Sequence, residues 1–246
     1  MKRLLAILIL LAPCIVMASG GMQPVGSVYI GGEEPGGAYT DTFDANINNW
    51  TSIGPVTYAW YEIGVMICTA TGSTQHSAAY FETQLSGVKQ AMKVEIVAAE
   101  DNTPYTGVIF RRTGGAGEKF YRVIANPGDT NVYWSYCTDD ADLLPSADIA
   151  TDDMTGDWDE GDWLGVEVSG TGDDTVVNVW RWTNDPGEYD ESYTNWGVPG
   201  VAGDTIVFTT NPSANACDTG LYTGVYTFNP TTAKSTAYDN WYVISP

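Results

Sequence analysis

Hydrophobic and polar residues alternate, or β-branched and aromatic residues cluster, in short runs between residues 40 and 246. Turn-forming segments such as NPGDTN (126–131) and NDPGE (184–188) separate the runs, and helical periodicity is nearly absent. Many short strands punctuated by turns predict an all-β fold, a two-sheet antiparallel sandwich. The predicted strands cover residues 56–63, 65–70, 77–84, 90–99, 105–112, 119–125, 131–136, 163–170, 175–182, 204–210, 220–228 and 237–244.

Two similar segments, each with an aspartate beside aromatic residues, stand at the two ends of this region. They are YTDTFDANINNWTSI (39–53) and STAYDNWYVIS (235–245). The first and last strands of a sandwich are exposed edges unless they pair, so we expect these two segments to pair within one sheet. The two-residue period of a strand then points four side chains inward, those of Phe43, Trp50, Trp241 and Val243.

Two segments break the regular spacing of the strands. Residues 19–39 contain seven glycines and two prolines without a hydrophobic period, which predicts a flexible linker. Residues 138–162 contain ten acidic residues and are expected to form a long surface loop. The folded unit is therefore predicted to be one domain over residues 40–246.

Residues 1–18 have the pattern of an export signal. Lys2 and Arg3 precede an apolar run, and small residues close the segment at Ala18. A membrane-spanning helix is the alternative, but Pro13 interrupts a run shorter than the roughly 20 residues that a bilayer needs. Acylation at Cys14 as a lipoprotein is a second alternative, which Pro13 fits badly. We expect a signal peptide, a secreted, cell-surface or periplasmic protein, and no membrane insertion after its removal.

The charge of the chain narrows the class of partner. The formal net charge is −21, and removal of Lys2 and Arg3 lowers the ten basic residues to eight, against 31 acidic ones. Such a surface repels nucleic acid and anionic membranes. It suits a neutral ligand, a cation such as calcium, or a salty environment.

Three cysteines follow the predicted signal peptide: Cys68, Cys137 and Cys217. In an exported protein a pair of cysteines can oxidise. Cys137 ends a strand-like run and Cys217 lies in a loop-like segment, so these two are expected to form a disulfide. Cys68, inside an apolar run, is expected to be a buried free thiol.

Four segments, in this order, resemble the concanavalin A-like lectin/glucanase superfamily, and its laminin G-like modules in particular. They are DTFDANINNW, YTGVIFRR with KFYRVIANPGDTNVYW, DWLGVEVSGTGDDTVVNVWRW, and DTGLYTGVYTFNPTTAKSTAYDNWYVI. The resemblance covers most of residues 40–246. It implies a two-sheet jelly roll of about a dozen strands that commonly binds glycans and often carries a structural calcium ion.

The superfamily's β-glucan hydrolases carry two glutamates flanking an aspartate, and the nearest match is Glu95 to Glu100 in EIVAAE. Retaining hydrolysis needs two carboxyl groups about 5.5 Å apart. Residues five apart on a regular strand face opposite sides, although a β-bulge would bring them to one face. Val97 stands where the family has its aspartate, so two solvated glutamates are the favoured interpretation. His76 is expected to be a surface or loop residue, and no zinc or phosphate-binding motif is present.

Calcium is the one cofactor that the sequence favours. Asp44 and Asp239 come close if the end segments pair, and hard cations take several carboxylate and carbonyl oxygens. The alternative is two turn and edge aspartates that accept backbone hydrogen bonds. DMTGDWDEGDW lacks the final glutamate of an EF-hand and is expected to be solvated acid.

Glycan binding needs aromatic rings on a rigid sheet with polar groups nearby. Trp180 and Trp182 share one face of VVNVWRW, and the other candidates beside them in the sheet are Trp134, Tyr121 and Arg111. Each tryptophan has core packing as its alternative. Arg111 also belongs to a cluster with Arg112, Lys119 and Arg122, for which an acidic-sugar contact and internal ion pairs are both open.

The sequence therefore favours a secreted, non-catalytic β-sandwich that binds a polysaccharide or glycan. A glycoside hydrolase that uses Glu95 or Glu100 is the first alternative. A structural or adhesive cell-surface protein is the second, because one sandwich fold hosts many functions.

Overall fold

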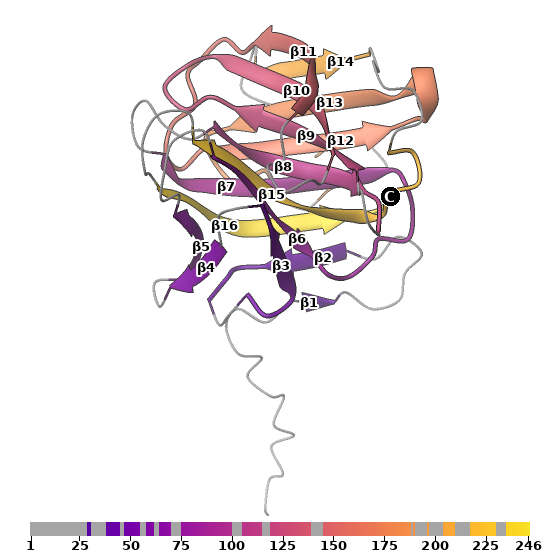
Figure 1. Cartoon of the computed structure of the whole chain (residues 1–246). Helices are drawn as coiled ribbons and strands as arrows, with labels where there is room; N and C mark the ends of the chain where they lie inside the picture. The colour runs from indigo at the N-terminus through magenta and orange to yellow at the C-terminus, as the bar shows by residue number, and fades with distance from the viewer. Residues whose placement is uncertain are drawn as a thin grey trace, which may run out of the picture.

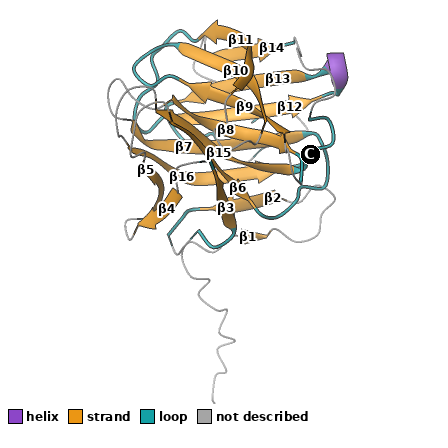
Figure 2. Ribbon diagram, viewed as in Figure 1, coloured by secondary structure: helices purple, strands orange, loops and turns teal. Residues whose placement is uncertain are grey.

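The structure is a computed structural model, and its strands form the two sheets of a β-sandwich (Figure 1). The described residues are 29–30, 38–44, 47–54, 58–61, 64–69, 75–99, 105–114, 119–138, 145–187, 189, 196, 204–209, 217–229 and 235–246. Within them the secondary structure is strand, apart from one 3-10 turn at Gly172–Asp174 (Figure 2). The predicted all-β, two-sheet antiparallel sandwich is confirmed.

The first sheet, which we call sheet A, has a central path of strands that all pair antiparallel. In spatial order they are β1 (Tyr29–Ile30), β2 (Ala38–Asp41), β16 (Ser235–Ile244), β7 (Gln90–Ala99), β12 (Trp163–Ser169), β13 (Val176–Trp182) and β14 (Thr205–Phe208). A side branch of β4 (Tyr58–Tyr61) and β5 (Val65–Thr69) joins β16.

The second sheet, sheet B, is also antiparallel. Its order is β11 (Pro145–Asp153), β10 (Asn131–Thr138), β9 (Lys119–Ala125), β8 (Tyr105–Arg112), β15 (Tyr222–Asn229), β6 (Gln75–Phe81) and β3 (Trp50–Ile53). Figure 1 shows β11 and β14 at one side of the sandwich and β1, β2 and β3 at the other. Each of the twelve predicted runs overlaps one of these strands.

The end segments meet as predicted. Trp241 pairs with Asp41 in register, so the last strand lies beside β2. Phe43, Trp50, Trp241 and Val243 are all buried in the core between the sheets. The first segment also divides: β2 stays in sheet A, whereas Trp50 begins β3, which pairs with β6 in sheet B. This single segment therefore ties both sheets together at one edge.

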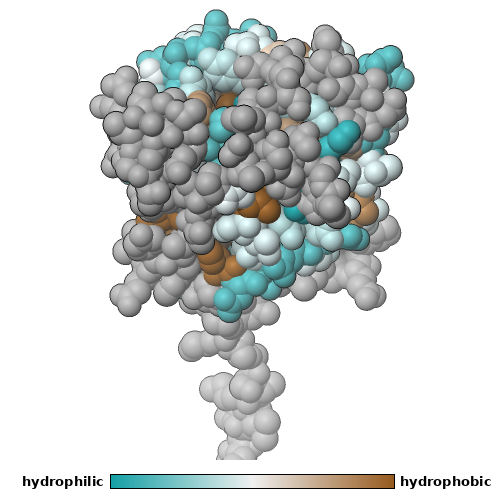
Figure 3. Space-filling view, viewed as in Figure 1, coloured by the Kyte–Doolittle hydropathy of each residue, from teal (hydrophilic) through white to brown (hydrophobic). Residues whose placement is uncertain are grey.

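Large apolar side chains are nearly all enclosed. Among the described residues Val207, on the edge strand β14, is the exposed large hydrophobic one, at 54 %. Among the coloured residues of Figure 3, small brown patches lie beside hydrophilic ones. No helix in the described part of the chain is long and apolar enough to cross a bilayer. Residues 1–28 and 31–37 lie outside the described residues.

Three expectations need correction. Tyr29 and Ile30 pair with Thr40 and Tyr39, so strand pairing extends into the predicted linker. Residues 145–153 of the predicted acidic loop form strand β11 on the edge of sheet B. His76 lies in β6 and is buried, because its ring stacks on Phe228 with centroids 4.0 Å apart.

The predicted disulfide is not formed, since Cys137 and Cys217 are both free and buried. The Cys137 side chain packs with Ile109 and Phe120 in a cluster on the outward face of sheet B. Cys217 belongs instead to the core between the two sheets. Burial, and then the nearby Cys137 thiol, raises the pKa of the Cys217 thiol. The side chain of Cys68 lies outside the described residues.

Candidate functional site

The outward face of sheet A carries a cluster of aromatic rings that strand alternation places there. β13 directs Trp180 and Trp182 outward, and these rings stack with centroids 5.9 Å apart and planes 14° apart. Trp196 packs edge-on against Trp182 at 6.0 Å and against Tyr189 at 5.2 Å. The cluster, each member buried, is Ala91, Trp163, Trp180, Trp182, Tyr189, Trp196 and Tyr242.

A glycine makes room for this cluster. Gly165 faces outward from β12, where a Cβ atom would lie 2.2 Å from the Trp182 ring. Any larger residue would therefore push the Trp182 ring off the sheet. Gly165 pairs with Lys93 on β7, and Lys93 pairs with Tyr242 on β16. Lys93 therefore lies between Tyr242 and Gly165 in one row of outward positions, and the Trp182 ring packs over Gly165.

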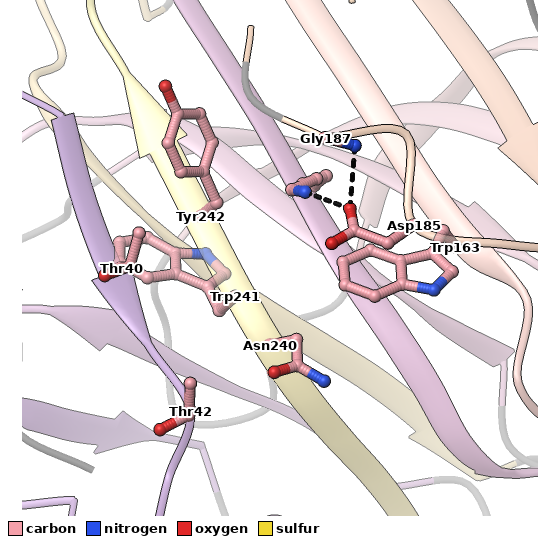
Figure 4. A pocket seen from close by; sticks show the side chains of 9 residues that line it. Thr40, Thr42, Trp163, Asp185, Gly187, Asn240, Trp241 and Tyr242 are labelled. Atoms are coloured by element: carbon pink, nitrogen blue, oxygen red, sulfur yellow. Dashed lines mark hydrogen bonds and ion pairs between the residues drawn. The ribbon is translucent and has the colours of Figure 1, made fainter. Parts of the chain in front are cut away.

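A pocket of about 200 Å³ opens where strands β2, β16, β7 and β12 lie side by side (Figure 4). Trp163 and Tyr242 supply aromatic surface, and Thr40 and Thr42 supply hydroxyl groups on the opposite side. Its lining residues are Thr40, Thr42, Lys93, Trp163, Asp185, Gly187, Asn240, Trp241 and Tyr242. The pocket therefore combines rings, neutral polar groups and one pair of opposite charges.

Lys93 is the buried cation of the pocket. Its Nζ atom lies 4.7 Å from the centroid of the Trp163 ring, 5.7 Å from that of Tyr242 and 5.9 Å from that of Trp196. Such positions are favourable because the ring faces carry negative charge density. Asp185 forms an ion pair with Lys93, and the same Asp185 oxygen accepts a hydrogen bond from the Gly187 amide at 2.9 Å (Figure 4).

The side of the pocket at Asn240 is built on a β-bulge. The register of β16 against β7 shifts between Asp239 and Tyr242, and Asn240 has a positive φ of 49°. Its Nδ2 atom donates to Glu95 Oε2 at 2.7 Å. Burial raises the pKa of Asp239 to about 6; the Asn240 amide lowers it, and the negative charge of Glu95 raises it further.

A second buried carboxylate lies next to the bulge. Asp41 accepts hydrogen bonds from the Phe43 amide at 2.8 Å and from Trp50 Nε1 at 2.9 Å. Burial outweighs these bonds and raises the pKa of Asp41 to about 6. The carboxylate therefore anchors the turn that carries the chain from sheet A to sheet B.

After burial and the charge of Glu95, the charge of Asp44 also raises the pKa of Asp239. Asp44 accepts a hydrogen bond from Thr42, and Asp239 accepts one from Asn240. Within the described ranges no three His, Cys, Asp or Glu side chains are grouped to hold a metal ion. Two carboxylates supply fewer than the six to eight oxygens that calcium takes, so a calcium ion here stays a prediction.

The outward face of sheet B holds a different polar group, drawn from four strands. Arg122 Nη1 donates to Tyr226 Oη, Arg122 Nη2 donates to Ser135 Oγ at 3.3 Å, and His76 Nδ1 lies 2.5 Å from Tyr226 Oη. A guanidinium group can only donate. The hydroxyl of Tyr226 can therefore accept from Arg122 and donate to His76, with the imidazole proton then on Nε2.

No protein-family profile and no curated protein sequence matches this chain. Solved structures do match it. A Bacillus subtilis protein of unknown function with a galectin-like fold has a TM-score of 0.56 and 8 % identity, over 89 % of this chain and 98 % of that one. This chain has the concanavalin A-like fold.

Two further solved structures are similar at lower scores. The β-glucanase of Bacillus licheniformis has a TM-score of 0.49 and 8 % identity, over 85 % of this chain and 98 % of that one. Lectin II from Ulex europaeus has a TM-score of 0.47 and 11 % identity, over 84 % of this chain and 97 % of that one. At such identities the likeness concerns the fold.

The concanavalin A-like fold separates the residues that sequence patterns grouped as one glycan platform. Trp180 and Trp182 do share a face, the outward face of sheet A. Trp134 and Tyr121 belong to sheet B and are fully buried between the sheets. Their rings pack against each other at 5.9 Å. These two residues are therefore core residues, because β9 and β10 turn these positions inward.

Arg111 is also buried, and it is used inside the protein. Its Nε atom donates to the Val88 carbonyl at 2.8 Å and Nη2 donates to the Gly170 carbonyl at 2.5 Å. Asp218 lies 3.7 Å from Nη1. Burial lowers the pKa of Arg111, and Asp218 opposes this change. Arg111 therefore ties three loops to the sandwich.

The other members of the predicted basic cluster have separate roles. Arg112 lies over the Tyr80 ring, with 3.8 Å between its guanidinium carbon and the ring centroid. Arg122 belongs to the Tyr226 group described above. Both residues therefore make contacts inside the protein, Arg112 a cation–π contact and Arg122 hydrogen bonds.

The structure describes Glu95 but not Glu100. The bulge that would alter their relative direction is present, since the register shifts around Val97. Glu95 is half-buried and held by Asn240. Glu100 lies outside the described residues, so the pairing of these two glutamates stays a prediction.

Sequence patterns missed the residues that line the pocket. Trp163, Lys93 and Tyr242 all lie in predicted strands, and their outward positions follow from the two-residue period. Which strands are neighbours does not follow from that period. The signal available was Trp163 and Tyr242 themselves, two large aromatic residues at outward positions.

Proposed function

We propose that this protein binds a polysaccharide or glycan, without cleaving it, at the pocket on the outward face of sheet A. The observation that carries the proposal is the composition of the pocket lining. Trp163 and Tyr242 bring aromatic rings to one space with the hydroxyl groups of Thr40 and Thr42. This lining offers one ligand both aromatic surface and hydrogen-bond partners.

The chemistry of sugars matches this lining. A sugar ring has C–H groups that pack on aromatic surface and hydroxyl groups that need hydrogen-bond partners. The threonine hydroxyls and the Asn240 amide can each donate and accept. A pocket of about 200 Å³ suits a terminal or branching sugar rather than a long buried chain.

The fold is consistent with glycan binding, but the proposal rests on the lining of the pocket. A galectin-like sandwich is a fold related to glycans, but one fold hosts several functions. From the acidic net charge we also propose that nucleic acid and anionic membranes are not its partners. With the predicted signal peptide, we further propose that the protein works outside the cytoplasm.

The test is a binding panel on the intact folded domain. Neutral and acidic polysaccharides are compared by calorimetry and by the thermal midpoint, which a ligand of the native state raises. Thr40→Val removes a pocket hydroxyl and keeps the shape, so it is expected to weaken binding roughly three- to tenfold. Thr151→Val, an equal change on the exposed part of β11, is the matched control.

Three outcomes decide the proposal. Binding that Thr40→Val weakens and Thr151→Val leaves unchanged supports the pocket as the site. If the folded protein binds no polysaccharide, glycan binding is rejected. If it then captures a partner in the absence of sugar, the structural or adhesive alternative is favoured. Release of reducing sugar would contradict the non-catalytic part of the proposal.

A further inference from the structure

The pocket contains a buried lysine, which neutral sugars do not require. Lys93 is 7 % exposed and stands in the middle of the outward face of sheet A. A buried ammonium group is costly unless its charge is balanced. Three rings contribute to that balance, but rings alone do not match the hydrogen bonds and charge that a carboxylate supplies.

Asp185 supplies that carboxylate from the solvent side. It follows β13 in an exposed turn, and its own side chain is 55 % exposed. The Gly187 amide holds the carboxylate toward the pocket (Figure 4). An ion pair with one exposed partner is weak, because water competes for the exposed group. Asp185 can therefore leave Lys93 without disturbing the strands.

We propose that Lys93 determines the specificity of this pocket by selecting acidic saccharides, whose uronate carboxylate takes the place of Asp185 on the ammonium group. The inference rests on the proposed function, since it names the ligand class of the same pocket. The exchange is between two carboxylates, so Lys93 keeps a hydrogen-bonded counter-charge throughout. Trp163 and Tyr242 then contact the ring of the same sugar.

The net charge of −21 opposes an acidic ligand only at long range. Salt screens charges farther apart than roughly 10 Å at 0.1 M. The contact with Lys93 is direct and partly desolvated, so it is screened much less. Acidic polymers are therefore expected to bind at physiological salt although the surface repels them.

The experiment compares one polymer with and without its charge. Polygalacturonate and its fully methyl-esterified form have the same backbone, and alginate provides a second uronate polymer. Dissociation constants are measured at 0.15 M salt for the wild type, Lys93→Met and Asp185→Asn. Thermal midpoints without ligand show that each variant is folded.

Lys93→Met is expected to weaken binding of the uronate polymers about tenfold or more, because a hydrogen bond to a charged group is lost. Asp185→Asn keeps the acceptor for Gly187 and removes the competing charge, so it is expected to tighten binding about two- to fivefold. The methyl ester is expected to bind weakly, with no response to Lys93→Met.

Equal binding of a polymer and its ester, or an unchanged affinity in folded Lys93→Met, overturns the inference. If neutral polysaccharides bind and Thr40→Val weakens them, the proposed function stands while the selection of acidic sugars fails. If no polymer of either kind binds, both fail together.

Discussion

Trp50 and Trp241 pack edge to face across the sandwich, with ring centroids 4.9 Å apart and planes 74° apart. Trp50 opens β3 in sheet B, and Trp241 lies in β16 of sheet A. Trp50 also donates its indole N–H to Asp41, which pairs with Trp241 in register. The two ends of the domain are therefore joined to each other and to both sheets at one place.

This contact predicts a measurable coupling energy. Trp50→Phe and Trp241→Phe are each expected to lower the free energy of unfolding by about 1–3 kcal/mol. Because the rings touch, the double variant is expected to depart from additivity by about 0.5–1.5 kcal/mol. Urea unfolding of the four proteins measures this. A cycle of Trp50 with Trp180, on the outward face, is expected to be additive within about 0.5 kcal/mol.

The pKa of about 6 at Asp239 predicts a pH dependence of stability. The unfolded carboxyl titrates near 3.8, so between these values the native state binds more protons than the unfolded state. Through this group the free energy of unfolding therefore falls as the pH rises from about 4 to about 6. The amide of Asp239→Asn stays neutral at every pH, so it avoids the cost of a buried charge. This variant is expected to be about 1 kcal/mol more stable than the wild type at pH 7.

The measurement is urea unfolding of both proteins from pH 4 to pH 8. The difference between the two curves isolates Asp239 from other titrating groups. A difference that stays constant across this range would show that burial does not disfavour the Asp239 charge. Asp173→Asn, at an exposed carboxylate of the 3-10 turn, serves as the matched change of charge.

Calcium at Asp44 and Asp239 predicts a different response at pH 7. If the ion bridges these strands, millimolar calcium raises the thermal midpoint over that in chelator, because it binds the native state alone. Asp44→Asn is expected to abolish that rise. Equal midpoints in calcium and in chelator would show that no calcium ion binds here. The roles of the two carboxylates would then be their hydrogen bonds with Thr42 and Asn240.

The hydrogen bonds of the Tyr226 hydroxyl are predicted to stabilise the outward face of sheet B. Tyr226→Phe removes an acceptor from Arg122 and a partner from His76. Loss of a buried hydrogen-bonded group is expected to cost about 1–3 kcal/mol in the free energy of unfolding. Tyr105→Phe changes a half-buried ring on the same face and is expected to cost less than about 0.5 kcal/mol. Equal effects of the two variants would contradict a special role for Tyr226.

The sequence predicted the strands well because alternation is a local property. Residues 90–99, 105–112 and 119–125 form strands with the predicted bounds. The inward positions of Phe43 and Trp241 followed from the same period. β11 was missed because the acidic residues of 138–162 resemble a loop, although an edge strand tolerates charge on its open side.

Local sequence patterns could not predict the candidate site. Thr40, Lys93, Trp163 and Tyr242 come from four strands that span about 200 positions of the chain, and they meet because β2, β16, β7 and β12 are neighbours in sheet A. Strand order and register arise from long-range pairing, which a two-residue period leaves open. His76 was misjudged for the same reason, since its partners Tyr226 and Phe228 lie 150 residues away along the chain.

The sequence by itself determined that this chain forms a β-sandwich, that Phe43, Trp50, Trp241 and Val243 point into its core, and that its end segments pair. These features follow because apolar alternation and the need to cover strand edges act locally or at the chain ends. Tertiary structure alone decided which outward residues become neighbours. It placed Trp134 and Tyr121 in the core, left Cys137 and Cys217 as buried free thiols, and set Lys93 among three rings beside Asp185. The physical reason is that a binding surface is built across strands, where the pairing of distant segments fixes every distance.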